Sequence, residues 1–110
     1  MTWTVDQSGT TAALTIGTET QLGTNSTNNA TFVLKVNTSN LALGDVVEMR
    51  IYIEDITAGT VVQAWKGTFA NPQINNVKIS PPVASDISYK ATLKQIAGTG
   101  RTYTWEILRI

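Results

Sequence analysis

Alternation of apolar and polar residues is the feature that most constrains the fold of this chain. Between Val46 and Glu54 every second residue is apolar, namely Val47, Met49, Ile51 and Ile53. A repeat of two places successive side chains on opposite faces of a β-strand, and no useful stretch carries the 3.6-residue repeat of a helix. We expect the apolar set to face the core, because a register shift of one residue would bury Glu48 and Arg50 instead.

The same alternation predicts about eight strands at short, regular spacing. The candidate segments are Thr2–Val5, Ala12–Ile16, Thr18–Leu22, Thr31–Val36, Val46–Glu54, Val61–Ala70, Val77–Ser80, Ile87–Gln95 and Tyr103–Ile110. Short strands separated by turn residues favour an antiparallel β-sandwich or jelly roll. The sequence therefore predicts an all-β fold, with residues 1–110 forming a single domain of ordinary size.

Several connections carry their own expectations. Gly23–Asn29 is predicted to be a polar loop, Thr57–Thr60 a turn, and Ala97–Gly100 a hairpin turn between the last two strands. Leu41 and Leu43 are expected to close one end of the core. In the strand Val61–Ala70 we expect a bend or bulge at its glycine.

Composition excludes several classes of protein. The chain has no cysteine, so disulfides and thiolate zinc sites are absent. Eight basic and eight acidic residues give a net charge of zero, which argues against binding to nucleic acid or to an anionic membrane. The first residues lack the features of a signal peptide, and no apolar run is long enough for a membrane helix. We expect the chain to remain in the cytosol or to assemble there into something larger.

Residues for catalysis or metal binding are sparse. Without histidine, the chain cannot form a Ser-His-Asp or Cys-His site. Glu48 and Glu54 share a predicted strand face but lie about 20 Å apart at strand spacing, too far for a glycosidase pair. We interpret them as solvated charges. Glu54, Asp55 and Asp86 offer too few oxygens for calcium. The sequence predicts a protein that is not an enzyme and has no cofactor or metal.

The final strand is apolar on both faces. Tyr103, Trp105 and Ile107 share one face and are assigned to the core, which leaves Leu108 and Ile110 for a neighbouring subunit. Deletion of residues 108–110 is therefore expected to weaken assembly more than folding. The predicted contact regions are this strand and the loop Gly23–Asn29, with the candidate interface residues Tyr103, Trp105, Leu108, Ile110, Asn25, Asn28 and Tyr52. We also expect a homo-oligomer, a dimer or a trimer.

Five segments carry a resemblance to a known group of proteins. They are Ala30–Val36, Leu43–Tyr52, Thr68–Ala70, Pro82–Asp86 and Leu93–Arg101. These segments resemble small proteins encoded among the structural genes of tailed bacteriophages. By size and all-β pattern the chain also resembles the cement proteins that decorate phage capsids.

The resemblance implies a function, a partner and a location. It implies a virion structural protein that binds the outer surface of a phage head, with the major capsid protein as partner. Such a protein is located on the capsid surface after assembly in the host cytoplasm. The alternatives are a tail, neck or fibre subunit, or a carbohydrate-binding module that stacks sugars on Trp3, Trp65 or Tyr52.

Overall fold

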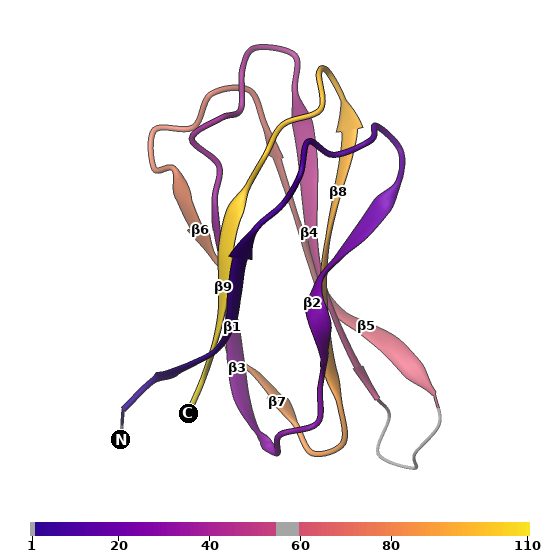
Figure 1. The fold of residues 1–110 in the computed structure, drawn as a ribbon, viewed down its shortest axis with the longest axis vertical. Helices are drawn as coiled ribbons and strands as arrows, with labels where there is room; N and C mark the ends of the chain where they lie inside the picture. Colours follow the sequence, from indigo (N-terminus) through magenta and orange to yellow (C-terminus); the bar gives the residue numbers. More distant parts are fainter. Residues whose placement is uncertain (1, 55–59) are drawn as a thin grey trace.

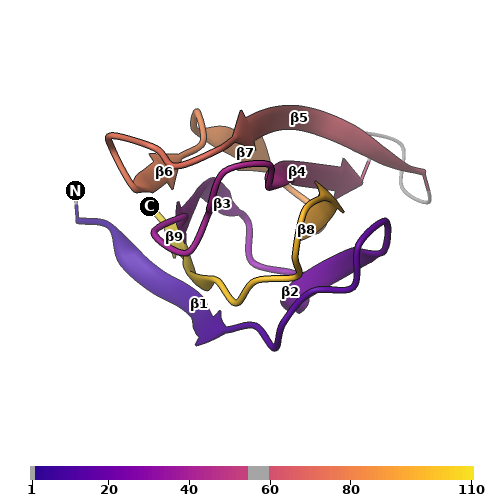
Figure 2. The same cartoon turned by 90° about the horizontal axis from the view of Figure 1, so that it is seen from above.

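Two antiparallel sheets pack face to face in the computed structural model, which describes residues 2–54 and 60–110 (Figures 1 and 2). Sheet A contains β1 (Thr4–Thr10), β9 (Thr104–Arg109), β3 (Ala30–Asn37), β6 (Val77–Ile79) and β7 (Val83–Ser85). Sheet B contains β2 (Glu19–Ser26), β8 (Tyr89–Ala97), β4 (Val46–Glu54) and β5 (Val61–Ala70). The prediction of an all-β sandwich is confirmed.

Strand pairing follows the order of a jelly roll. In sheet A the order is β1-β9-β3-β6, with β7 also on β3, and in sheet B it is β2-β8-β4-β5. The pairs β1–β9, β2–β8, β3 with β6 and β7, and β4–β5 are nested in the sequence, as in one long hairpin. Rolling that hairpin places successive pairs in alternate sheets and adds the contacts β3–β9 and β4–β8.

The core consists of the inward faces of both sheets, as the alternation predicted. Val47, Met49 and Ile51 are fully buried, which confirms the register expected for β4. Phe32 of β3 stacks on Tyr89 of β8 with ring centroids 4.4 Å apart, and this contact joins the two sheets. The other fully buried large side chains include Leu22, Leu34, Leu93, Tyr103 and Ile107.

The predicted hairpin between the last two strands is wrong. β8 belongs to sheet B and β9 to sheet A, so the segment between them is an arch that crosses the sandwich. Asp45, buried at the start of β4, holds this arch. Its carboxylate accepts hydrogen bonds from the amide of Thr99 at 3.0 Å and from Nε of Arg101 at 2.7 Å. Both glycines of the segment are needed for this arch, because a Cβ at Gly98 would collide with Asp45 and a Cβ at Gly100 with the carbonyl of Leu14.

Further expectations differ from the structure. The first strand, expected at Thr2–Val5, is β1 and runs to Thr10. Ala12–Ile16 is not a strand but a connection whose Leu14 is buried. β2 extends through the first half of the predicted loop Gly23–Asn29, to Ser26. At the end of the core Leu41 is buried as expected, whereas Leu43 is 86% exposed.

The irregularity of β5 lies elsewhere than predicted. Trp65 and Gln63 pair with consecutive residues of β4, so the extra residue is Ala64 and not Gly67. Gly67 has a different role, since the indole of Trp65 occupies the space that a Cβ there would need. Of the predicted turn Thr57–Thr60, residues 57–59 lie outside the described part of the chain, as does Asp55.

Candidate functional site

The outer face of sheet A carries a cluster of apolar side chains. Val5, Leu108 and Val33 occupy facing positions on β1, β9 and β3. Together with Trp3, Ile79 and Pro82 they form what we call the apolar face. Trp3, Val33, Ile79, Pro82 and Leu108 line a hollow of about 270 Å³. Val33 is already covered, whereas Trp3, Val5 and Ile79 are exposed. Exposed apolar side chains that gather on one sheet face are typical of an interaction site.

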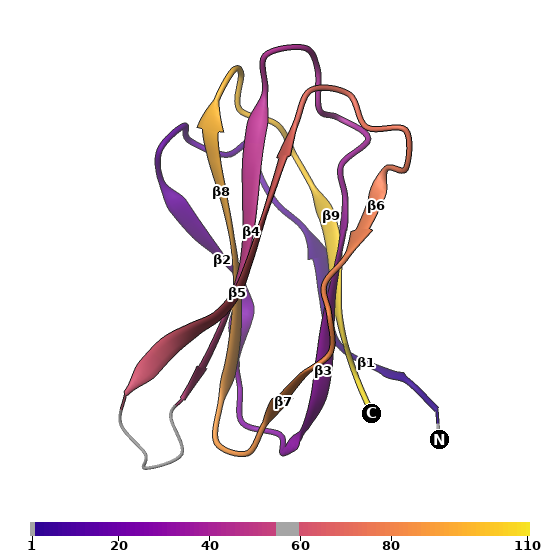
Figure 3. The same cartoon turned by 180° about the vertical axis from the view of Figure 1, so that it is seen from behind.

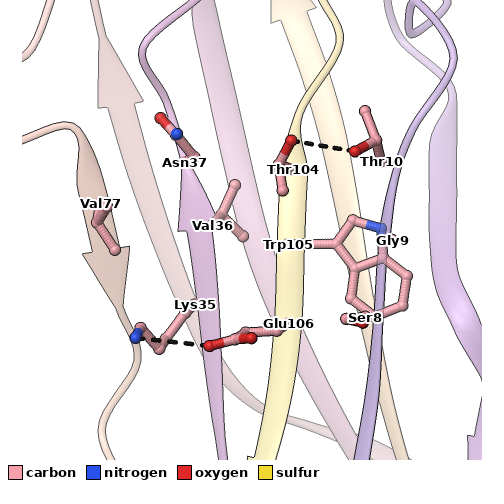
Figure 4. Close-up of a pocket in the computed structure, with 10 residues that line it drawn as sticks. All are labelled: Ser8, Gly9, Thr10, Lys35, Val36, Asn37, Val77, Thr104, Trp105 and Glu106. Carbon is pink, nitrogen blue, oxygen red and sulfur yellow. Dashed lines mark hydrogen bonds and ion pairs between the residues drawn. The ribbon is translucent and has the colours of Figure 1, made fainter. Parts of the chain in front are cut away.

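A second, more polar hollow continues along the same face, with a volume of about 440 Å³ (Figure 4). The hydroxyls of Thr10 and Thr104 lie 3.1 Å apart on one side of it, and Lys35 pairs with Glu106 at 3.6 Å on the other. The indole of Trp105 packs against Gly9, where a Cβ would lie 3.3 Å from the ring. The outer face of sheet A is thus apolar at one end and polar, with paired charges, at the other.

The outer face of sheet B is built differently, from a network of charges. Arg50 lies 3.2 Å from Glu48 and 3.4 Å from Glu19, and Lys66 lies 3.4 Å from Glu48. These cations cover Glu48, which is only 6% exposed. Our interpretation of Glu48 as a solvated charge is therefore wrong, because its cationic neighbours exclude water from it.

The carboxylates of this network have shifted pKa values. Burial raises the pKa of Glu48, but hydrogen bonds and charge from Arg50 and Lys66 outweigh it, so the net pKa is lowered. Glu19 behaves in the same way: burial opposes hydrogen bonds from Thr92 and Tyr52, and the net pKa is again lowered. Both groups are held ionised, whereas a general acid at neutral pH needs a raised pKa.

Two of the predicted interface residues belong to the core. Tyr103 is 1% exposed and donates a hydrogen bond from its hydroxyl to Gln95 Oε1 at 3.0 Å. Burial, with a further contribution from the charge of Asp45, raises the pKa of Tyr103 to about 12. Trp105 is also buried, so neither side chain is presented to a partner. Leu108 lies on the apolar face, and Ile110, 37% exposed, follows the same strand.

The other three predicted residues belong to different parts of the fold. Asn25, at the end of β2, accepts a hydrogen bond from Gln21. Asn28 donates to Asp6 at 2.7 Å. Tyr52 lies on the outer face of sheet B, where it donates to Glu19 and carries the ammonium of Lys90 over its ring at 4.9 Å. The structure therefore does not gather the seven candidates into one surface.

Sequence reasoning missed most of the apolar face. Trp3, expected only as a stacking platform for sugars, precedes β1, and Val5 and Ile79 lie on strands of unremarkable pattern. Their proximity depends on the pairing of β1 with β9 and of β6 and β7 with β3. The local signals were two apolar residues on otherwise polar strand faces, Leu108 on the last strand and Val33 on Thr31–Val36.

Comparisons with protein-family models, curated proteins and solved structures find no match to this chain. Over residues 2–54 and 60–110, no three acidic, histidine or cysteine side chains are grouped closely enough to share a metal ion. The same residues include no helix of the length and hydrophobicity needed to cross a membrane. The candidate functional site is therefore defined by its geometry, as the outer face of sheet A.

Proposed function

We propose that this protein is a non-enzymatic structural protein of a phage virion, and that it decorates the capsid by binding to the outer surface of the head. The observation that supports this proposal is the apolar face, where Val5, Val33 and Leu108 form a row across three strands. Its partner is the major capsid protein, and its location is the capsid surface after assembly in the host cytoplasm.

Burial of the apolar face supplies the driving force for docking. Val5 is 51% exposed, Ile79 61% and Trp3 41%. Covering a half-exposed side chain of this size contributes about 1 kcal/mol, since full burial contributes about 1.5–3 kcal/mol. The polar hollow beside it suits the wet rim of an interface, and many copies on one shell turn modest affinity into firm attachment.

A jelly roll alone does not specify a function. The resemblance to cement proteins is what favours the head as the place of binding. The same face would serve a tail, neck or fibre subunit, and the position of the chain in the particle separates these cases. A carbohydrate-binding module has less support. Trp65 lies on the inward face of β5, where it packs against the core, and Lys90 covers the ring of Tyr52, so neither is an open platform on an outer face.

The test is co-sedimentation of the purified protein with heads of the phage that encodes it, before and after shell expansion. We expect binding to expanded heads and not to procapsids. Val5→Asp with Ile79→Asp places charge on two exposed positions of the apolar face and is expected to abolish binding. Ile96→Asp, at an exposed apolar position (42%) on β8 of sheet B, is the matched control and is expected to bind normally.

Two results would overturn the proposal. Electron microscopy of the intact particle that finds this chain absent from the head would exclude decoration of the capsid. Equal binding by the double variant and by Ile96→Asp would exclude the apolar face as the docking surface.

A further inference from the structure

The two sheets have four edges, and three of them are protected. β1 and β2 lie beside each other along one side of the sandwich (Figure 2). There the side chain of Gln7 takes the place of a neighbouring strand: its Nε2 donates to the carbonyl of Thr24 at 2.9 Å, and its Oε1 accepts from the amide of Thr24 at 2.8 Å. These contacts join the edge of sheet A to the edge of sheet B.

The third edge, formed by β6 and β7, is protected by its brevity. Each of these strands has three residues, and Pro81 and Pro82 between them have no amide to donate. Short strands and prolines are common devices against pairing of an edge with another chain. An incoming strand would find no continuous ladder there.

The edge of β5 has a bulge at Ala64, but it is neither short nor interrupted by proline, and its residues from Trp65 to Ala70 pair regularly with β4. β5 has ten residues, contains no proline and carries one charged side chain, Lys66. It is the last strand of sheet B, and within the described chain it pairs only with β4 (Figure 3). A long, weakly charged and exposed edge strand is a template for pairing with another chain.

The inward face of β5 is also incompletely covered. Trp65 and Phe69 are only partly buried, and the indole of Trp65 lies against Gly67 between them. The strands of sheet A on this side are short. The ammonium of Lys78 in β6 lies 5.1 Å from the centre of the Phe69 ring, and both aromatic rings remain at the margin of the core. A further strand beside β5 would add side chains to this margin and bury both rings more completely.

We propose that β5 pairs in antiparallel fashion with β5 of a second copy, centred on Gly67. In this register Trp65 faces the partner's Phe69, and Lys66 faces the partner's Thr68. The seven residues from Ala64 to Ala70, beyond which Asn71 turns away with a φ of 63°, then pair with the same seven of the other copy. No like charges face each other directly, and each Lys66 keeps Glu48 of its own chain at 3.4 Å.

The pairing is self-complementary, which is why the occupant is a second copy. Aromatic residues meet aromatic residues on the inward face, which is a favourable cross-strand combination. A register shifted by two residues toward the start of β5 would instead set Lys66 against the partner's Lys66, with like charges directly opposed. The charge of Lys66 therefore favours the register centred on Gly67 over the one centred on Lys66.

This dimer has a consequence for docking. Facing residues of antiparallel strands point to the same side of a sheet, so sheet B continues from one copy to the next. Both copies of sheet A then lie on the same side of the continuous sheet, and their apolar faces point in the same direction. The dimer would then bind a particle through two apolar faces at once. Only this bivalent attachment rests on the proposed function.

The experiment measures dimerisation by analytical ultracentrifugation across a concentration series. We expect a wild-type dimer. Thr68→Lys sets a lysine opposite the partner's Lys66 at two symmetry-related positions, and it should weaken dimerisation roughly tenfold. Within its own chain the new lysine faces Glu48, so the monomer should remain folded. Thr104→Lys, at an exposed threonine of sheet A, is the matched control and should dimerise as the wild type does.

A charge-swapped variant tests the register itself. Lys66→Glu combined with Thr68→Lys places opposite charges at the facing positions and should restore the dimer. Hydrogen exchange should show protection of the amides at 64–70 that increases with protein concentration. A wild-type monomer at high micromolar concentration would overturn the proposal. A dimer unaffected by Thr68→Lys would overturn the β5 interface, whatever the outcome of the capsid-binding test.

Discussion

Asp45 is the residue on which one end of the sandwich depends. Its carboxylate accepts hydrogen bonds from the amides of Ala42 and Thr99 and from Arg101, and its backbone carbonyl accepts from Asn71. The carboxylate thereby ties the segment of Thr99 and Arg101 to the start of β4, and the backbone carbonyl ties Asn71 to the same residue. Since Asp45 is 1% exposed, water cannot replace these contacts if the carboxylate is removed.

Replacement of Asp45 by alanine is therefore expected to be severe. Two amides and a guanidinium lose their acceptor, and we expect the free energy of unfolding to fall by about 3 kcal/mol. Urea denaturation followed by circular dichroism measures this change. Asp86→Ala, at an exposed aspartate, is the control and should change stability by less than about 0.5 kcal/mol. Similar effects for the two variants would show that the Asp45 contacts contribute little.

The same carboxylate predicts a dependence of stability on pH. Burial raises the pKa of Asp45, but hydrogen bonds from Ala42, Arg101 and Thr99 and the charge of Arg101 lower it below its ordinary value of 3.8. A group with a lowered folded-state pKa stabilises the protein above its unfolded pKa, and this contribution is lost as the pH falls through the folded value. At pH 7 the free energy of unfolding of the wild type should exceed that of Asp45→Asn by the full contribution of the carboxylate. This difference in stability should narrow below about pH 4.

Urea titrations of both proteins between pH 7 and pH 2.5 measure that difference. The comparison isolates Asp45 because Glu19 and Glu48, whose pKa values are also lowered, are present in both proteins. A difference that stays constant down to the lowest pH would contradict the lowered pKa of Asp45.

For a single residue, the sequence gives the type of side chain but not the residues that contact it in the fold. Asp45 follows Gly44 and is typical of a turn, and nothing nearby indicates that Thr99 and Arg101, more than fifty positions away, bind its carboxylate. Glu48 was misjudged for the same reason. Its alternation correctly predicts the outward face of β4, while its burial depends on Arg50 of the same strand and on Lys66 of the neighbouring strand.

Individual strands were predictable where their pattern is long. The bounds of β4 and β5 agree with the predicted Val46–Glu54 and Val61–Ala70, because regular alternation ends at turn residues in both. Which strands pair was not predictable. Ala97–Gly100 has the glycines of a hairpin turn. In the structure, however, the side-chain amide of Gln95 donates hydrogen bonds to the carbonyls of Ala97 and Thr99, and the chain crosses to the other sheet.

The position of β9 reverses one expectation about the C-terminus. Residues 108–110 were expected to matter for assembly more than for folding, but β9 lies between β1 and β3 in sheet A. Leu108 pairs with Val5 on one side and Val33 on the other, and Ile110 exchanges two backbone hydrogen bonds with Thr31. Deletion of residues 108–110 should therefore unfold the protein.

Circular dichroism and a thermal melt of the truncated chain check this expectation. Val5→Asp is the control, since it alters the same row of side chains at an exposed position without removing ladder hydrogen bonds. A truncated chain that melts as cooperatively as the wild type would show that the end of β9 contributes little to folding.

At the scale of the whole molecule, the nested pairing implies an order of folding. The pair β4–β5 joins neighbouring strands, whereas β1–β9 joins the two ends of the chain. Closing the long loops costs entropy before their contacts form, so distant pairs are slow to form and all-β folds of this kind fold slowly. We infer that the β4–β5 hairpin and its contact with β8 form early, and that β9 enters sheet A late.

Two matched substitutions test this order. Ile51 of β4 and Ile107 of β9 are both buried, at 0% and 1% exposure, and replacement of either by valine should cost about 1 kcal/mol of stability. Ile51→Val should act mainly by slowing folding, because its contacts are present in the transition state. Ile107→Val should act mainly by speeding unfolding. Stopped-flow folding and unfolding rates across urea concentrations separate the two effects. If Ile107→Val slowed folding as much as Ile51→Val, both ends of the chain would already be paired at the transition state.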